Sequence, residues 1–166
     1  LEVVFTRLHA GGKFNKDDGA SAYRFSGGLH GVGVSVTNAL STRLEVEVVR
    51  DGARHQMAFA GGAVVEPLRR VGDAPKKATG TRLRAWPDPP FFDSPTIPLA
   101  QLERLLRSKA LLLPGLQVSL TVEDGASSEW CFAKGMVQYL SEQLDAEMVA
   151  PVFSSEKYVA KGDETF

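Results

Sequence analysis

The chain is poor in cysteine, with one such residue among 166. A single cysteine excludes a framework of disulfide bonds within the chain and is typical of a reducing compartment. This residue, Cys131, lies between Trp130 and Phe132, a setting in which a thiol usually serves as a small apolar filler. We therefore expect Cys131 to be buried and to have no chemical role.

The chain also lacks an excess of positive or negative charge, and it lacks long apolar runs. The 19 lysines and arginines nearly balance the 20 aspartates and glutamates, which leaves a formal net charge of −1. This balance gives no overall attraction to nucleic acid, and no stretch is long and apolar enough to cross a membrane. Because 43% of the residues are hydrophobic, the chain can bury a core. We therefore expect a cytoplasmic globular domain with no membrane partner.

Two familiar phosphate-binding motifs do not occur. The P-loop pattern fails because Gly12-Lys13 is followed by Phe14. The dinucleotide-binding glycine pattern fails because Val36 stands at its third glycine position, after Gly31-Val32-Gly33. A phosphate cradle in this chain is therefore neither a P-loop nor a Rossmann turn.

The most informative stretch that is present is Phe-Ser-Gly-Gly-Leu-His-Gly-Val-Gly-Val-Ser at residues 25–35, ahead of a helical pattern at residues 34–40. Glycine lets backbone N–H groups converge and removes the Cβ that would block a close approach. A helix start adds unpaired N–H groups and a partial positive charge. This combination favours an anion, most simply phosphate, although a glycine-rich stretch alone is more often a flexible turn.

A second glycine pair precedes this run, at Gly11-Gly12, and is followed by Lys13. The residues between the two runs are small or polar and show no apolar period, which is typical of a surface loop. Glycines at both ends would let such a loop fold over a ligand, and Lys13 could then reach a terminal phosphate. The alternative is a solvated surface lysine.

These stretches carry a resemblance to a known family. Residues 8–14, 23–35 and 38–41 resemble the ATP lid of bacterial type II topoisomerase B subunits, members of the GHKL ATPase superfamily. Gly80-Thr81-Arg82-Leu83-Arg84 resembles the strand that lines the adenine pocket of that family. Further motifs, at residues 86–95 and 107–115, are more similar to the topoisomerase IV branch than to the gyrase branch. The resemblance covers nearly the whole chain and thins after Val122.

The resemblance implies the GHKL (Bergerat) ATPase fold, an α/β (α+β) two-layer sandwich with a largely antiparallel sheet and helices on one face. It implies that residues 1–150 are the C-terminal portion of the ATPase domain, including the ATP lid, and that its N-terminal part is missing. Residues 151–166 would be the truncated start of a transducer domain.

The hydrophobic pattern independently predicts short turns between antiparallel strands. Asp51-Gly52 is a strong hairpin signal, and residues 72–77 are expected to form a loop. The periodicity predicts strands around residues 44–49, 57–59, 64–65, 81–86 and 116–122, and helices around residues 3–8, 34–40, 99–106 and 135–144.

On the phosphate side, the resemblance implies that backbone N–H groups hold the β- and γ-phosphates, while the lid adds a cation and an aromatic contact. His30 is interpreted as bracing the loop, with a catalytic role as the alternative. The residues concerned are Gly12, Lys13, Tyr23, Gly28, Leu29, His30, Gly31, Val32 and Gly33.

On the base side, the resemblance implies that Val4, Phe5, Val34 and Leu83 wall the adenine pocket. Thr81 would bridge to adenine through a water molecule. Arg50 would lie at the rim, where aminocoumarin inhibitors bind the family. The alternatives are an ordinary core for the apolar residues and a plain charged strand end for Arg50.

The function implied is that of an ATP-hydrolysing type II DNA topoisomerase, with the topoisomerase IV branch first and the gyrase branch second, located at the bacterial nucleoid. ATP-driven homodimerisation would gate DNA strand passage, with Mg²⁺ as cofactor and an A-type subunit and DNA as partners. The catalytic glutamate and the magnesium-holding asparagine of the family are expected upstream of Leu1, so no catalytic or metal-binding residue is expected in this chain. The alternative is a non-catalytic GHKL module for nucleotide binding or dimerisation.

Overall fold

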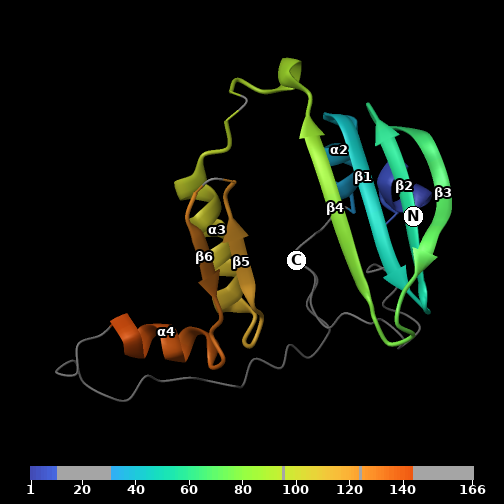
Figure 1. The fold of residues 1–166 in the computed structure, drawn as a ribbon. Helices are drawn as coiled ribbons and strands as arrows, with labels where there is room; N and C mark the ends of the chain where they lie inside the picture. The colour runs from blue at the N-terminus through green and yellow to red at the C-terminus, as the bar shows by residue number, and fades with distance from the viewer. Residues whose placement is uncertain (11–30, 95, 124, 144–166) are drawn as a thin grey trace, which may run out of the picture. The chain divides into compact units, whose positions relative to one another are not determined.

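The computed structural model describes residues 1–10, 31–94, 96–123 and 125–143. The chain divides into two compact units, Leu1–Pro95 and Thr96–Phe166 (Figure 1). The first unit is built on a four-stranded antiparallel sheet with the strand order β3-β2-β1-β4. Its strands are β1 (Ser41–Arg50), β2 (Ala53–Ala60), β3 (Ala63–Asp73) and β4 (Gly80–Pro87).

Two tight hairpin turns set the register of this sheet. Asp51 and Gly52, between β1 and β2, have φ angles of 53° and 79°, and Gly61 and Gly62, between β2 and β3, have φ angles of 53° and 86°. Positive φ at both central residues is the geometry that matches the right-handed twist of paired strands. The predicted hairpin at Asp51-Gly52 is therefore confirmed. β3 continues to Asp73, so that the predicted loop at residues 72–77 begins later than expected.

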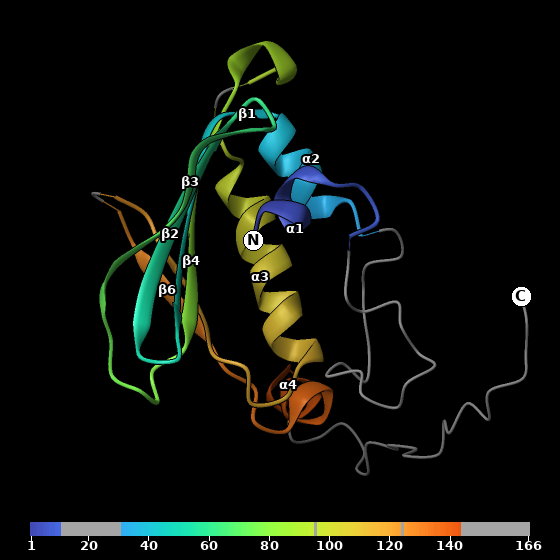
Figure 2. The ribbon, with the colours of Figure 1, turned by 90° about the vertical axis from the view of Figure 1, so that its right-hand side faces the viewer.

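Two helices lie on one face of the sheet, as Figure 2 shows edge-on. They are α1 (Glu2–Thr6) and α2 (Gly33–Ala39), and a short 3₁₀ helix, η1 (Pro89–Phe91), follows β4. The core lies between these helices and the sheet. It consists of Phe5, Leu44, Val46, Met57 and Phe59, with Val48 and Val64 packed against it.

Because side chains alternate along a strand, the two faces of the sheet differ in character. Residues directly opposite in an antiparallel pair share a face, and Val46 is paired with Met57 on one side and with Leu83 on the other. This face is apolar and carries the helices. The neighbouring position, Glu47, is paired with Gln56 and Arg82, so the opposite face is polar.

In the residues that the structure describes, the second unit holds two helices and a two-stranded antiparallel sheet. The elements are α3 (Leu99–Leu112), β5 (Val118–Thr121), β6 (Ser127–Trp130) and α4 (Gly135–Gln143). Phe132 is buried and meets the ring of Tyr139 edge-on, with 6.0 Å between the ring centroids. The guanidinium of Arg107 lies 5.2 Å from the centroid of the same tyrosine ring.

Several sequence expectations are confirmed and two are wrong. The antiparallel sheet with helices on one face is confirmed, as are the helices near residues 34–40, 99–106 and 135–144. The strand expected over 116–122 is shorter, because the N–H of Leu116 bonds the carbonyl of Leu113 in a turn. Cys131 is exposed rather than buried: its neighbour Phe132 faces inward, and adjacent side chains in extended chain point to opposite sides.

The predicted boundary after residue 150, and with it the proposed start of a transducer domain, lies outside the described residues. No helix in the described stretches combines the length and the apolar character needed to cross a membrane.

Candidate functional site

The described part of the glycine run enters α2 through a left-handed residue. Gly31 has a φ angle of 61°, a conformation that costs residues with a Cβ about 1–2 kcal/mol. Val32 is the N-cap of α2 and Gly33 its first residue. The N–H groups of the first turn of a helix have no partner within that helix. Residues 31–33 therefore combine a left-handed residue with a helix start, and their binding of phosphate stays a prediction.

The remaining residues predicted on the phosphate side lie outside the described residues. They are Gly12, Lys13, Tyr23, Gly28, Leu29 and His30.

On the base side, α1 contributes one buried and one exposed residue. Phe5 is only 5% exposed and stacks on Phe59, with ring centroids 5.3 Å apart. Its ring is therefore part of the core. Val4 on the same helix is exposed, as is Val34 in the first turn of α2. These two valines thus offer accessible apolar surface on α1 and α2.

Strand β4 carries the other two predicted base-side residues. Thr81 is paired with Val48, and Leu83 with Val46. Both Thr81 and Leu83 therefore lie on the apolar face of the sheet, the face that holds Phe5 and the helices. Among the strands that the structure describes, β4 has β1 as its only neighbour, and Leu83 is exposed on this face.

A buried asparagine that the sequence analysis did not single out as a site residue connects the two helices. Asn38 on α2 has no exposed surface, and its Nδ2 donates a 3.0 Å hydrogen bond to the carbonyl oxygen of Phe5. Within the described residues its Oδ1 is buried without a hydrogen-bond partner. Asn38 thereby fixes α1 against α2. The motif Asn-Ala-Leu-Ser at residues 38–41 was the available signal.

Arg50 lies at the end of β1 and is mostly exposed. Its side chain pairs only with the adjacent Asp51, at 3.3 Å between Nε and Oδ2, among the residues that the structure describes. The strand alternation places it on the same face as Val48. This position agrees with the rim expected from the sequence, and equally with a plain charged strand end.

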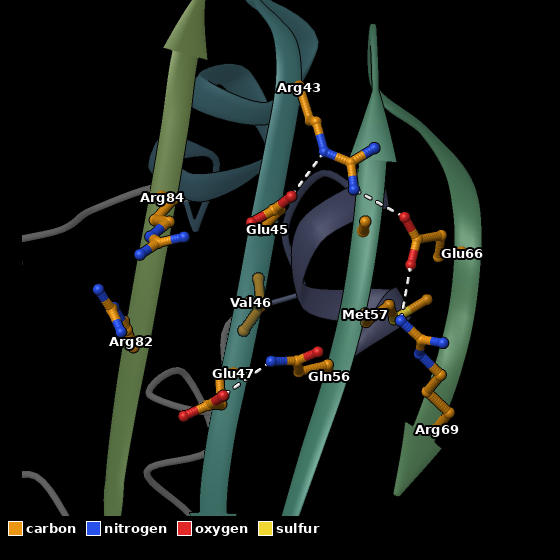
Figure 3. Close-up of a pocket in the computed structure, with 11 residues that line it drawn as sticks. Arg43, Glu45, Val46, Glu47, Gln56, Met57, Glu66, Arg69, Arg82 and Arg84 are labelled. Carbon is orange, nitrogen blue, oxygen red and sulfur yellow. Dashed lines mark hydrogen bonds and ion pairs between the residues drawn. The ribbon is translucent and has the colours of Figure 1, made fainter. Parts of the chain in front are cut away.

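The polar face of the same sheet has a shallow hollow of about 190 Å³ (Figure 3). Its lining residues come from all four strands. The charged and amide side chains among them are Arg43, Glu45, Glu47, Gln56, Glu66, Arg69, Arg82 and Arg84.

One ion-pair network crosses this hollow from β1 to β3. Arg43 bonds Glu45 at 2.6 Å and Glu66 at 2.7 Å, and Arg69 approaches the second oxygen of Glu66 at 3.2 Å. The hydrogen bond from Arg43 lowers the pKa of the Glu66 carboxyl below its ordinary value, and the bonds from Glu66 and Glu45 raise the pKa of Arg43. Both groups stay charged at neutral pH. The alternation of polar residues along residues 43–47 was the only sequence signal for this network.

The chain is similar to the B subunits of bacterial type II topoisomerases, both in sequence and in structure. No protein-family profile matches the sequence. The B subunit of DNA topoisomerase 4 from Escherichia coli is 43% identical over 152 residues, which are 91% of this chain and 24% of that protein. The B subunit of DNA gyrase from Thermus thermophilus is also 43% identical, over 144 residues, or 87% of this chain and 22% of that protein.

A solved structure of the topoisomerase IV ATP-binding domain of Francisella tularensis, in complex with a small-molecule inhibitor, matches with a TM-score of 0.69 at 36% identity. The match covers 93% of this chain and 40% of that one. The chain thus spans about a quarter of the length of the curated relatives that it matches. These comparisons confirm the resemblance and the fold that the sequence predicts.

Proposed function

We propose, from the homology of this chain to the B subunits of bacterial type II topoisomerases, that it is the ATP-binding portion of such a protein. The B subunit of topoisomerase IV is the first assignment and that of gyrase the second. The motifs at residues 86–95 and 107–115 favour the first, whereas the identities to the two relatives, 43% in each case, do not separate them.

One observation carries the nucleotide site. Gly31 adopts a left-handed backbone directly before α2, and α2 lies on the sheet face that also holds Thr81 and Leu83. A phosphate chain at the glycine run and a base near β4 would therefore lie on one face of one sheet. We assign the β- and γ-phosphates to backbone N–H groups of residues 28–33 and the γ-phosphate also to Lys13, with Gly12 and Tyr23 in the lid.

The base would lie against apolar surface at the edge of the core. Val4, Val34 and Leu83 are exposed on the helix-bearing side, and Phe5 supports them from the core. The Thr81 hydroxyl is assigned a water-mediated contact with adenine, and Arg50 a place at the inhibitor rim. Because ADP lacks the γ-phosphate, lid contacts with that group would make the closed state depend on ATP.

For the whole protein we propose ATP-driven homodimerisation that gates DNA strand passage, together with an A-type subunit. Hydrolysis would then reopen the gate. Mg²⁺ is expected with the triphosphate. In the described ranges no group of three or more His, Cys, Asp and Glu side chains is placed to hold a metal ion.

The second candidate is a non-catalytic nucleotide-binding or dimerisation module of the same superfamily. It predicts the same nucleotide contacts without turnover. ATP-dependent decatenation or relaxation by the intact protein with its A-type partner would decide for the topoisomerase, and nucleotide binding without either activity would decide for the module.

The site itself is tested by titrating the ¹⁵N-labelled chain, and the intact protein, with a non-hydrolysable ATP analogue. We expect amide shifts at residues 31–34 and at Thr81 and Leu83, and loss of binding in Gly31→Val. The matched control is Gly115→Val, which places the same side chain at a φ angle of 81° in the other unit. Binding that survives Gly31→Val, or that both variants lose equally, would refute the cradle.

A further inference from the structure

Strand β4 carries two arginines on the face opposite to the proposed nucleotide site. Thr81 and Leu83 lie on the apolar face, so the alternate residues Arg82 and Arg84 lie on the polar face and line its hollow. Two positions along a strand are about 6.8 Å apart. Figure 3 shows both guanidinium groups on the same side of β4, with that of Arg82 reaching toward Arg84.

The carboxylates opposite these arginines are already engaged. Glu47 is paired in register with Arg82, but its two oxygens meet Gln56 Nε2 at 2.8 Å and Arg54 Nε at 3.6 Å. Glu45 is paired in register with Arg84, but it accepts from Arg43. In the described part of the chain, neither Arg82 nor Arg84 has an ion pair or a side-chain hydrogen bond.

The third glutamate of the hollow is also engaged by arginines. Both oxygens of Glu66 are bonded, one by Arg43 and one by Arg69. The network from β1 to β3 is therefore neutralised internally, and the positive charge of the hollow is concentrated on its β4 side. Arg82 and Arg84 form no direct ion pair with the carboxylates opposite them, and two neighbouring cations repel each other. An anion between them would offset that repulsion.

We propose that Arg82 and Arg84 form a binding site for a phosphate oxyanion on the open face of the sheet. A guanidinium presents several N–H donors in a fixed plane and binds phosphate bidentately. A phosphate has three or more oxygens, so two such groups can bind it at the same time through different oxygens. The phosphate can come from a nucleic-acid backbone or from a free phosphate compound.

This site is independent of the proposed nucleotide site. Its residues alternate with Thr81 and Leu83 on one strand and point to the other face. The two proposals can therefore be refuted separately. The NMR signals of Arg82 and Arg84 report on the phosphate oxyanion site, and the amide signals of Thr81 and Leu83 report on the nucleotide site.

The test records the arginine Nε–Hε signals of the ¹⁵N-labelled chain during titration with pyrophosphate and, separately, with a short DNA duplex. We expect the signals of Arg82 and Arg84 to move, and Arg82→Gln and Arg84→Gln each to weaken binding about fivefold or more. Raising the salt from about 50 to about 200 mM should weaken the duplex complex further. A response to pyrophosphate alone identifies a free phosphate as the ligand, and a response to the duplex identifies a nucleic-acid backbone.

The matched control is the double variant Lys76→Gln/Lys77→Gln, which removes two exposed positive charges from the loop before β4. It should bind like the parent chain. The proposal is overturned if neither ligand moves the Arg82 and Arg84 signals, or if the lysine variant loses as much affinity as the double variant Arg82→Gln/Arg84→Gln. Binding that is lost in Gly31→Val but kept in the arginine variants would assign pyrophosphate to the nucleotide site and also overturn it.

Discussion

The side-chain amide of Asn38 donates its hydrogen bond to the backbone carbonyl of Phe5, a residue 33 positions earlier in the chain. This bond joins the last turns of α1 and α2 inside the core. Both helices carry residues assigned to the nucleotide site, Val4 and Phe5 on one and Gly33 and Val34 on the other. The relative position of these two helices therefore depends on a buried contact between them.

Replacing Asn38 by alanine should destabilise the first unit by about 1–3 kcal/mol, because the Phe5 carbonyl would lose its buried donor and a small cavity would remain. The measurement is urea unfolding followed by the signals of β1 and β2. The control is Thr37→Ala, one position along the same helix, where an exposed hydroxyl bonds the Gly33 carbonyl. That change should stay within about 0.5 kcal/mol of the parent. Equal effects of the two variants would contradict the assigned role of Asn38.

Phe59 should contribute far more to stability than an exposed phenylalanine. Its side chain has no exposed surface and stacks on Phe5, so Phe59→Ala should cost about 3–5 kcal/mol. Phe91→Ala makes the same chemical change at a side chain that is 59% exposed, and it should cost less than about 1 kcal/mol. Thermal or urea unfolding of both variants checks this. A small effect at Phe59 would mean that the core is not where the structure places it.

Much of the first unit could be predicted from the sequence because its signals are local. Polar–apolar alternation in residues 44–49, the Asp51-Gly52 turn and the glycines before α2 each restrict the backbone within a few residues. The resemblance then named Thr81 and Leu83 as base-side residues. The structure places both on the apolar face of the sheet, and their contact with a nucleotide stays a prediction.

The rest depends on contacts between distant segments, which periodicity does not encode. The Asn38–Phe5 bond and the network that joins Arg43 to Glu66 across β2 require the folded sheet. The exposure of Cys131 follows from the inward position of Phe132 after β6, a short strand without a clear pattern. Sequence alone also gave no reason to separate Arg82 and Arg84 from ordinary solvated charges.

The Glu66 carboxyl should make stability depend on pH in the acidic range. Its pKa is lowered in the folded state, chiefly by the hydrogen bond from Arg43. Its contribution is therefore fully present above the ordinary glutamate pKa of about 4.3 and is lost as the pH falls through the lowered folded value. At pH 7 Glu66→Gln should lower the free energy of unfolding of the first unit. At low pH the variant and the parent should become equally stable in this respect, because Glu66 is then protonated in the parent.

Urea midpoints of parent and variant at neutral and acidic pH measure the effect. Asp93→Asn is the control, because Asp93 has no ion pair within the described part of the same unit. At pH 7 Asp93→Asn should destabilise the first unit less than Glu66→Gln does. A Glu66→Gln difference that is unchanged down to about pH 3 would rule out the predicted linkage.

Gly135 should tolerate alanine less well than Gly115, although both residues have positive φ angles, 56° and 81°. A Cβ on Gly135 would lie 2.9 Å from Cγ of Pro114 and 3.3 Å from the Leu111 carbonyl oxygen, whereas a Cβ on Gly115 would meet no atom within 4 Å. Both variants incur the left-handed strain of about 1–2 kcal/mol, and Gly135→Ala adds overpacking of about 1–3 kcal/mol. Since the proline ring has no flexible end to move aside, the second unit should open more easily in Gly135→Ala. Hydrogen exchange of the α3 and β5 amides measures this, and equal protection in the two variants would show that the ring yields.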